Sequence, residues 1–132
     1  MPATPDTRRS PGWTLWLFRV AVALELVSLL LQTGTAGELL EGVTSARVLH
    51  GGGSTFVHVF GLVTLVAAIL VWRPGRGPWW PSVAGLVLLL AGFAQSAFGG
   101  AGQLALHVPV GVTLVVLATW LLVWSSLRRP SR

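Results

Sequence analysis

Residues 104–127 read LALHVPVGVTLVVLATWLLVWSSL, and this stretch decides the class of fold. It contains no charged side chain, and its apolar residues run on without the strict alternation of a half-buried strand. A helix rises about 1.5 Å per residue, so the stretch is long enough to cross the ~30 Å of hydrocarbon in a bilayer. We therefore predict a transmembrane helix here.

Three further apolar stretches precede this one. We predict spans at residues 13–32, 48–72 and 79–98 in addition to 104–127. The composition agrees, because 53% of the 132 residues are hydrophobic and only 10% are charged, whereas a soluble domain has about 25% charged residues. We expect one all-α membrane domain over residues 13–128, preceded by a disordered cytoplasmic tail at residues 1–12.

The connections between the spans predict an up-down-up-down four-helix bundle. Spans two and three, and spans three and four, are joined by short turns, so each pair must be antiparallel neighbours. The connection at residues 33–47 is longer. We expect it to be a loop that holds a short interfacial helix near residues 38–43.

The arginines predict the orientation of the bundle. Arg19 lies within the first span, seven arginines lie on one side of the membrane, and only Arg47 lies on the other. The seven are Arg8, Arg9, Arg73, Arg76, Arg128, Arg129 and Arg132. Such an excess marks the cytoplasmic side. We expect both termini in the cytoplasm and the protein in a bacterial cytoplasmic membrane.

The composition also excludes several classes of function. The chain has no cysteine, which excludes disulfides, thiolate metal sites and iron–sulfur clusters within it. The arginines lie at the ends of apolar stretches and form no basic stripe, so we expect no nucleic-acid partner. No serine or threonine has a base that can be placed beside it, which disfavours an enzyme with such a nucleophile.

Ionisable side chains inside the spans are the candidates for function. Each costs on the order of 2.5–3.5 kcal/mol on insertion scales, so such groups usually face the protein interior and have partners. Counting residues from the cytoplasmic ends of the spans predicts two polar layers. The inner layer contains Glu25, His58 and Gln95, and the outer layer contains His50 and His107.

Within the inner layer we expect Glu25 and His58 to be in contact. Such a pair either satisfies two buried polar groups or relays protons, which would suit a small proton-linked carrier. Arg19 is six residues from Glu25, about 120° around the helix. We therefore expect Arg19 to reach toward the cytoplasmic interface rather than to pair with Glu25.

The outer layer suggests a haem site. A low-spin b-type haem needs two neutral imidazoles at similar depth on facing helices, and His50 and His107 enter spans two and four at matching levels. Arg47 stands at the rim, where it can meet a propionate. His58 lies six residues deeper, roughly 9 Å, and is the alternative partner of His107. Histidines that serve only as hydrogen-bonding groups are the competing interpretation.

Two short motifs carry a resemblance to known proteins. They are VLHG at residues 48–51 and LHVPVG at residues 106–111. They resemble segments of small, mostly uncharacterised four-span membrane proteins of high-GC bacteria. The layout is also similar to one half of haem A synthase and, more loosely, to membrane b-type cytochromes. The resemblance implies that His50 and His107 ligate haem and that the function is haem binding or electron transfer. The chain departs from the pattern at Arg47, because the resemblance would place an acidic residue at this position.

The third span predicts a packing face of small residues. Gly85, Gly92 and Gly99 recur every seven residues and share one side of a helix. Membrane helices associate through such faces because their backbones can approach closely. The face predicts packing within the bundle or against a membrane partner or second copy, which makes a non-enzymatic subunit or scaffold a further alternative.

Overall fold

The computed structural model describes residues 12–128. The predicted tail at residues 1–12, apart from Gly12, lies outside the described residues. The same holds for four of the arginines used to predict the orientation. These are Arg8, Arg9, Arg129 and Arg132.

The described part of the chain is entirely helical apart from its turns. It contains α1 (Gly12–Leu40), α2 (Ala46–Trp72), α3 (Trp80–Gly100) and α4 (Leu104–Leu127). By length and composition, each of the four is able to cross a membrane. This confirms the prediction of an all-α protein with four apolar helices and indicates a multi-pass membrane protein. Pro81 lies in the first turn of α3, where its missing N–H breaks no helical hydrogen bond.

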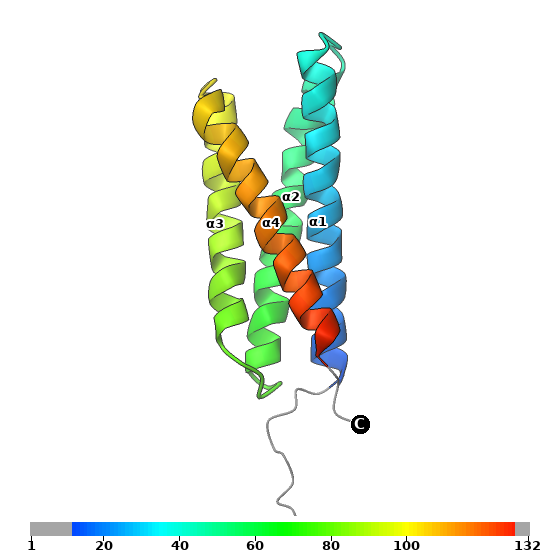
Figure 1. Cartoon of the computed structure of the whole chain (residues 1–132), viewed down its shortest axis with the longest axis vertical. Helices are drawn as coiled ribbons and strands as arrows, with labels where there is room; N and C mark the ends of the chain where they lie inside the picture. Colours follow the sequence, from blue (N-terminus) through cyan, green and yellow to red (C-terminus); the bar gives the residue numbers. More distant parts are fainter. Residues whose placement is uncertain (1–11, 129–132) are drawn as a thin grey trace, which may run out of the picture.

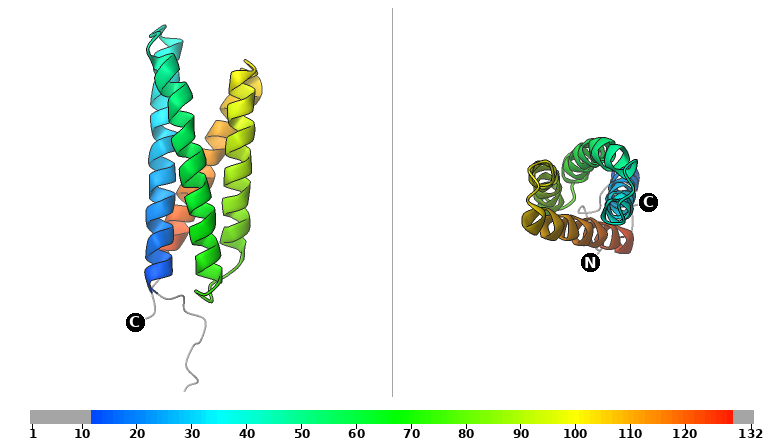
Figure 2. Two further views of the ribbon diagram at one scale, coloured as in Figure 1. Left: turned by 180° about the vertical axis from the view of Figure 1, so that it is seen from behind. Right: turned by 90° about the horizontal axis from the view of Figure 1, so that it is seen from above.

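The four helices form a ring, in which each helix contacts two neighbours (Figures 1 and 2). α1 contacts α2 and α4, and α3 also contacts α2 and α4, so α2 and α4 lie across the ring from each other. The α1–α2 and α3–α4 turns lie at one end, which we call the open end (Figure 1). The α2–α3 turn and both ends of the described chain lie at the other, the closed end.

α1 is longer than the sequence predicted. The loop expected at residues 33–47 is helical as far as Leu40, and residues 38–40 belong to α1 rather than to a separate interfacial helix. The hydroxyls of Thr33 and Thr35 donate to carbonyls of the preceding turn, so these polar groups are satisfied within the helix. At about 1.5 Å per residue α1 is roughly 43 Å long, and the α1–α2 hairpin extends beyond α3 and α4 at the open end (Figure 1).

Close packing is concentrated toward the closed end. In each helix the buried residues extend from the closed end only part of the way toward the open end. The buried residue farthest from the closed end is Leu29 in α1, Val57 in α2, Gly92 in α3 and Leu114 in α4, with Ala46 of α2 as the one exception. All other described residues nearer the open end are half-buried or exposed. The bundle is therefore a packed core in one half and a looser arrangement in the other.

Aromatic rings close the packed half. The ring of Phe18 in α1 meets Trp124 of α4 edge to face, with 6.1 Å between centroids. Trp80 at the start of α3 contacts both Trp124 and Trp120, at 4.6 and 4.8 Å. Aromatic pairs at such distances add to the energy of area burial. These rings join α1, α3 and α4 at the closed end.

Arg19 ties α1 to the end of α4. Its Nε and Nη2 atoms donate to the carbonyl oxygen of Ser125 at 3.0 and 2.7 Å, and Nη2 also donates to the carbonyl of Arg128. The last carbonyls of a helix have no partner within the helix, and a cation there also interacts favourably with the helix dipole. The expectation that Arg19 turns away from Glu25 toward the helix ends agrees with this position.

Candidate functional site

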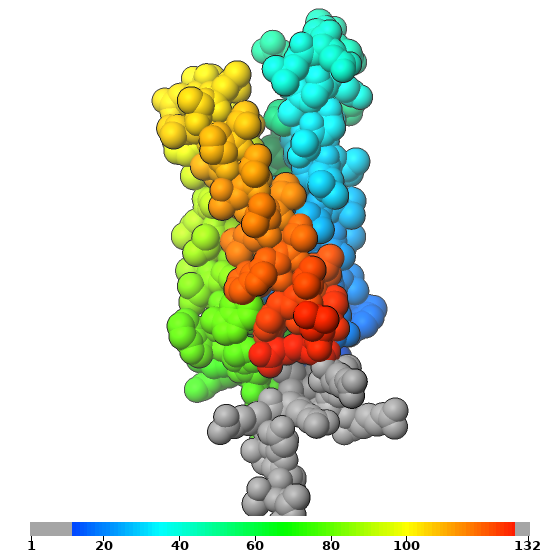
Figure 3. Space-filling view, in the orientation of Figure 1, coloured from blue at the N-terminus to red at the C-terminus, as the bar shows by residue number. Residues whose placement is uncertain are grey.

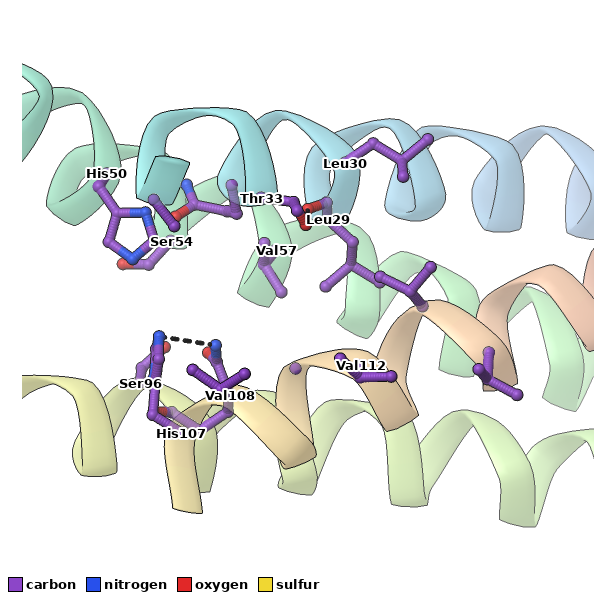
Figure 4. Close-up of a pocket in the computed structure, with 16 residues that line it drawn as sticks. Leu29, Leu30, Thr33, His50, Ser54, Val57, Ser96, His107, Val108 and Val112 are labelled. Atoms are coloured by element: carbon purple, nitrogen blue, oxygen red, sulfur yellow. Dashed lines mark hydrogen bonds between the residues drawn. The ribbon is translucent and has the colours of Figure 1, made fainter. Parts of the chain in front are cut away.

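A cavity of about 310 Å³ lies among the four helices in the open half of the bundle (Figure 4). This volume is at the lower end of the range typical of small-molecule sites. Eight of its sixteen lining residues are aliphatic, namely Leu29, Leu30, Ala36, Val57, Val108, Val112, Val115 and Val116. Seven are polar, and the remaining one is Gly111. The polar ones are Gln32, Thr33, His50, Ser54, Gln95, Ser96 and His107.

His107 is held by the backbone of α3. Its Nδ1 lies 2.7 Å from the carbonyl oxygen of Gln95. A carbonyl only accepts, so Nδ1 carries the proton and Nε2 keeps its lone pair. The side-chain amide of Gln95 lies 3.2 Å from Nε2 and donates to it. One residue of α3 therefore engages both nitrogens of the ring.

His50 is held by α1. Its Nδ1 lies 3.0 Å from the hydroxyl of Thr35. That hydroxyl has a single proton and lies within reach of the carbonyls of Leu31 and Gln32, at 3.2 and 3.1 Å. Thr35 therefore donates to the backbone and accepts from Nδ1–H of His50, so in the neutral ring Nε2 again carries the lone pair.

The two rings approach each other across the cavity. Their centroids are 6.0 Å apart and their planes are inclined by 66°. Two imidazoles bound to opposite sides of one iron, with bonds of about 2 Å and nitrogens about 1 Å from the ring centres, have centroids about 6 Å apart. Because α2 and α4 lie across the ring of helices, His50 and His107 project from opposite walls (Figure 4). Their separation suits a pair of axial ligands.

Other metal sites have less support. Among residues 12–128 no three side chains of His, Cys, Asp or Glu come together in a group that could hold a metal ion. Haem needs only two ligands from the protein, since the porphyrin nitrogens supply the other four. The donor set of His50 and His107 therefore fits a haem rather than an ion bound by side chains alone.

Gln95 joins the two predicted layers, because it contacts His107 while its neighbour Ser96 contacts His58. It bonds His107 and packs beside Gly111, where an added Cβ would come 3.2 Å from the Gln95 amide nitrogen. The depth count failed because it treated the helices as parallel to the bundle axis. α4 runs obliquely across the bundle (Figure 1), so its residues advance less per turn along that axis and His107 comes level with Gln95.

His58 has partners other than those expected. Its Nε2 lies 3.1 Å from the hydroxyl of Ser96, and its ring stacks on Phe93 with 4.2 Å between centroids. It does not line the cavity with His107. The structure thus places His50, not His58, beside His107, and joins His58 to α3.

Glu25 is fully buried, with neither carboxyl oxygen bonded to any group of the described chain. The expected contact with His58 is therefore not formed. The carboxyl instead points toward Gly61, where an added Cβ would lie 3.7 Å from Oε1. Gly61 is almost one turn closer to the closed end than His58, which explains why the two side chains miss each other. The hydroxyl of Thr64, one turn beyond Gly61, is likewise buried without a partner in the described chain.

Arg47 lies away from the cavity, and two glycines of the predicted packing face lie within the bundle. Arg47 is exposed and is not among the residues that line the cavity. Gly85 and Gly92 are buried against α2, where added Cβ atoms would meet Leu65 at 3.1 Å and Val57 at 3.8 Å. At these two glycines the face packs within the bundle, which is the first of the two alternatives that the sequence left open.

Gly99 is part of the same arrangement. A Cβ there would come 2.7 Å from the ring of His107, so the histidine depends on this glycine for its space. Sequence analysis assigned Gly99 to a packing face and did not connect it with His107. Gln95 and Gly99 are four residues apart on one face of α3, and that spacing is the signal that both serve the same neighbour.

Thr35, Ser96 and the opening of the cavity were also missed. Thr35 lay in a segment expected to be a loop, so its position beside His50 had no basis in the pattern. Ser96 was not among the residues that the sequence singled out. Comparison with known proteins gives no further guide, because no family model, no curated protein and no solved structure matches this chain.

Proposed function

We propose that the four helices cross a bacterial cytoplasmic membrane in alternating directions, with both termini in the cytoplasm. Two observations support this orientation. Among residues 12–128, Arg73, Arg76 and Arg128 lie at the closed end and Arg47 lies at the open end, and an excess of arginine marks the cytoplasmic side. Trp80, Trp120 and Trp124 gather near the closed end, as aromatic residues do at a membrane interface. The cavity then lies in the outer half of the bilayer.

We infer that this cavity binds a b-type haem between His50 and His107. The observation that carries the proposal is the pair of imidazole rings on opposite walls, with 6.0 Å between their centroids. Each ring donates Nδ1–H to an acceptor, the carbonyl of Gln95 or the hydroxyl of Thr35. Histidines that bind metals commonly make such a bond with their other nitrogen, because it fixes the tautomer and the ring orientation.

The residues of the cavity define what such a site can do. When bound, haem would supply one-electron transfer. Both His50 and His107 would be used to hold the haem, so the protein would leave no free coordination site for a substrate, which favours electron transfer or haem carriage. The aliphatic side chains around them, including Leu29, Val57 and Val115, exclude water from the rings.

The colour of the purified protein tests the proposal. Protein expressed with added haem precursor and purified in detergent should show a Soret band and the sharp visible bands of a reduced low-spin haem. His50→Ala and His107→Ala should each remove the low-spin spectrum, because each deletes one axial ligand. His58→Ala is the matched control, since His58 does not line the cavity and bonds the hydroxyl of Ser96, so its loss should leave the spectrum intact.

Two outcomes would count against haem binding. One is wild-type protein that stays colourless after incubation with haem in detergent and in lipid vesicles. The other is a low-spin spectrum that His58→Ala abolishes and His50→Ala preserves, because the axial ligand would then be a histidine outside the proposed pair.

A second candidate function rests on Glu25. An ionisable side chain in the middle of a membrane bundle is expensive and marks a functional site by default. Here the carboxyl is fully buried, and neither it nor the nearby hydroxyl of Thr64 has a hydrogen-bond partner within residues 12–128. These two groups are candidates for a proton pathway through the packed half.

Proton flux across vesicles tests this second candidate. Vesicles that contain the wild-type protein should dissipate an imposed pH gradient faster than vesicles that contain Glu25→Gln. Glu38→Gln is the matched control, because Glu38 is exposed at the open end. Equal rates for wild type and Glu25→Gln would leave Glu25 with a structural role only.

A further inference from the structure

The lining residues of this cavity that are exposed at the surface, Thr33 among them, all belong to α1 and α4. Four of its lining residues are also more than half exposed at the surface of the bundle: Leu30 at 53%, Val108 at 56%, Val112 at 59% and Val116 at 62%. Leu30 belongs to α1 and the three valines to α4. We call these four residues the mouth. Figure 3 shows the surface hollowed between α4 and α1 in the open half of the molecule.

The opposite wall is closed. The cavity residues that come from α2 and α3 are half-buried or buried, and none of them is exposed. Gly85 and Gly92 bring α3 against α2 along this wall, at Leu65 and Val57. A ligand of the histidines therefore passes between α1 and α4.

The chemistry of the mouth indicates the phase from which the ligand comes. All four of its residues are aliphatic, and they lie on helices that are apolar enough to cross a membrane. Their exposed surface therefore faces hydrocarbon. Haem is a flat apolar ring with a polar propionate edge, which suits a cavity with aliphatic walls and polar groups such as His50, Ser54 and His107. A molecule of this kind dissolves in a bilayer.

Gln95 supplies a second, independent observation. Its side-chain amide donates to Nε2 of His107, the nitrogen that would bind iron. The lone pair of the histidine is thus satisfied in the absence of a ligand, and ligation requires the amide to turn away. A buried polar atom left without a partner costs about 1–3 kcal/mol. Gln95 removes that cost from the ligand-free state, so it lowers the net affinity and favours release.

We propose that haem exchanges reversibly between this site and the outer leaflet through the mouth between α1 and α4, with Gln95 replacing iron on His107 whenever haem leaves. The proposal rests on the haem-binding function proposed above and specifies it. The chain is a haem carrier within the membrane rather than a permanent electron-transfer centre. Haem arrives by lateral diffusion and departs by the same route.

Exchange kinetics in vesicles test the route. The protein is reconstituted in phosphatidylcholine–phosphatidylglycerol vesicles. Loading is measured by the change in the Soret band after haem-containing vesicles are added. Release is measured by the transfer of haem to haem-free myoglobin. Val112→Trp narrows the mouth and should slow loading and release together, by about tenfold, since both steps use one passage. Val112→Ala widens it and should speed both.

The matched control is Val123→Trp. Val123 is on the same helix and is similarly exposed, at 51%, but it does not line the cavity. Its rates should equal those of the wild type. Val112→Ala adds no side-chain volume to the cavity, so the pair of variants remains decisive even when the tryptophan variant binds no haem.

The role of Gln95 is tested by Gln95→Leu. Without the amide, ligand-free His107 loses its partner at Nε2, so haem should dissociate about tenfold more slowly while the low-spin spectrum is retained. A residue that only supports the fold would give the opposite result, namely faster loss of haem.

The failure of each proposal gives a distinct result. If wild-type protein never acquires a Soret band, haem binding itself is wrong. If it binds haem but both Val112 variants exchange at the wild-type rate, or Gln95→Leu releases haem faster, haem binding stands and the lateral exchange is overturned.

Discussion

The closed and open halves of the bundle are built from similar apolar helices but pack in different ways. In the closed half, Phe18 and Trp124 fill the space between α1 and α4, and Arg19 binds the end of α4. In the open half, the same two helices diverge around a cavity lined by His50 and His107. The contrast teaches that helix length and hydropathy determine membrane insertion, whereas a few large or charged side chains determine where the bundle closes.

The largest expected effect is the loss of packing in the closed half. Phe18→Ala removes a fully buried ring that contacts Trp124, and should lower the free energy of unfolding by about 3–5 kcal/mol. Phe56→Ala is the control from the open half, where the ring is 59% exposed to lipid, and should change it by less than about 1 kcal/mol. Unfolding by sodium dodecyl sulfate, followed by circular dichroism, measures both. Equal effects would mean that the two halves are not packed differently.

The next effect concerns the link between α1 and α4. Arg19→Met keeps the length of the side chain but removes its bonds to the carbonyls of Ser125 and Arg128, and should cost about 1.5–3 kcal/mol. Arg19→Lys should recover part of the loss, because an ammonium can bond one carbonyl and still complements the helix dipole. The same unfolding titration applies. If methionine is as stable as arginine, the closed end is held by its aromatic rings alone.

A glycine pair probes the open half. Gly99→Ala places a Cβ 2.7 Å from the ring of His107, and should cost about 1–3 kcal/mol and displace the histidine. Gly100→Ala, one residue on, meets no atom within 4 Å and should be neutral or slightly stabilising. Haem affinity should fall for Gly99→Ala and not for Gly100→Ala. Identical behaviour of the two variants would show that His107 does not need the position described.

The sequence was sufficient to predict the four apolar helices, because length and hydropathy are properties of each segment alone. It was also sufficient to single out His50 and His107, since charged or polar groups inside a span are few. It misplaced His107 relative to Gln95 because depth along a helix depends on tilt, and α4 runs obliquely across the bundle. It missed Thr35 because nothing in residues 33–40 signals whether two glycines end a helix or are tolerated within it.

The smallest expected effect isolates the hydrogen bond that orients His50. Thr35→Val keeps the shape of the side chain and removes the acceptor of Nδ1–H, so the free energy of unfolding should fall by only about 1 kcal/mol. Haem affinity should fall about tenfold, because bonds of this kind fix a ligand's tautomer and ring orientation. Thr113→Val is the control, since that hydroxyl is exposed and bonds only the carbonyl of Pro109. If the Thr35→Val protein keeps full haem affinity, packing against the walls of the cavity is sufficient to orient the ring of His50. The two halves of the bundle would then differ in packing density but not in how they orient their side chains.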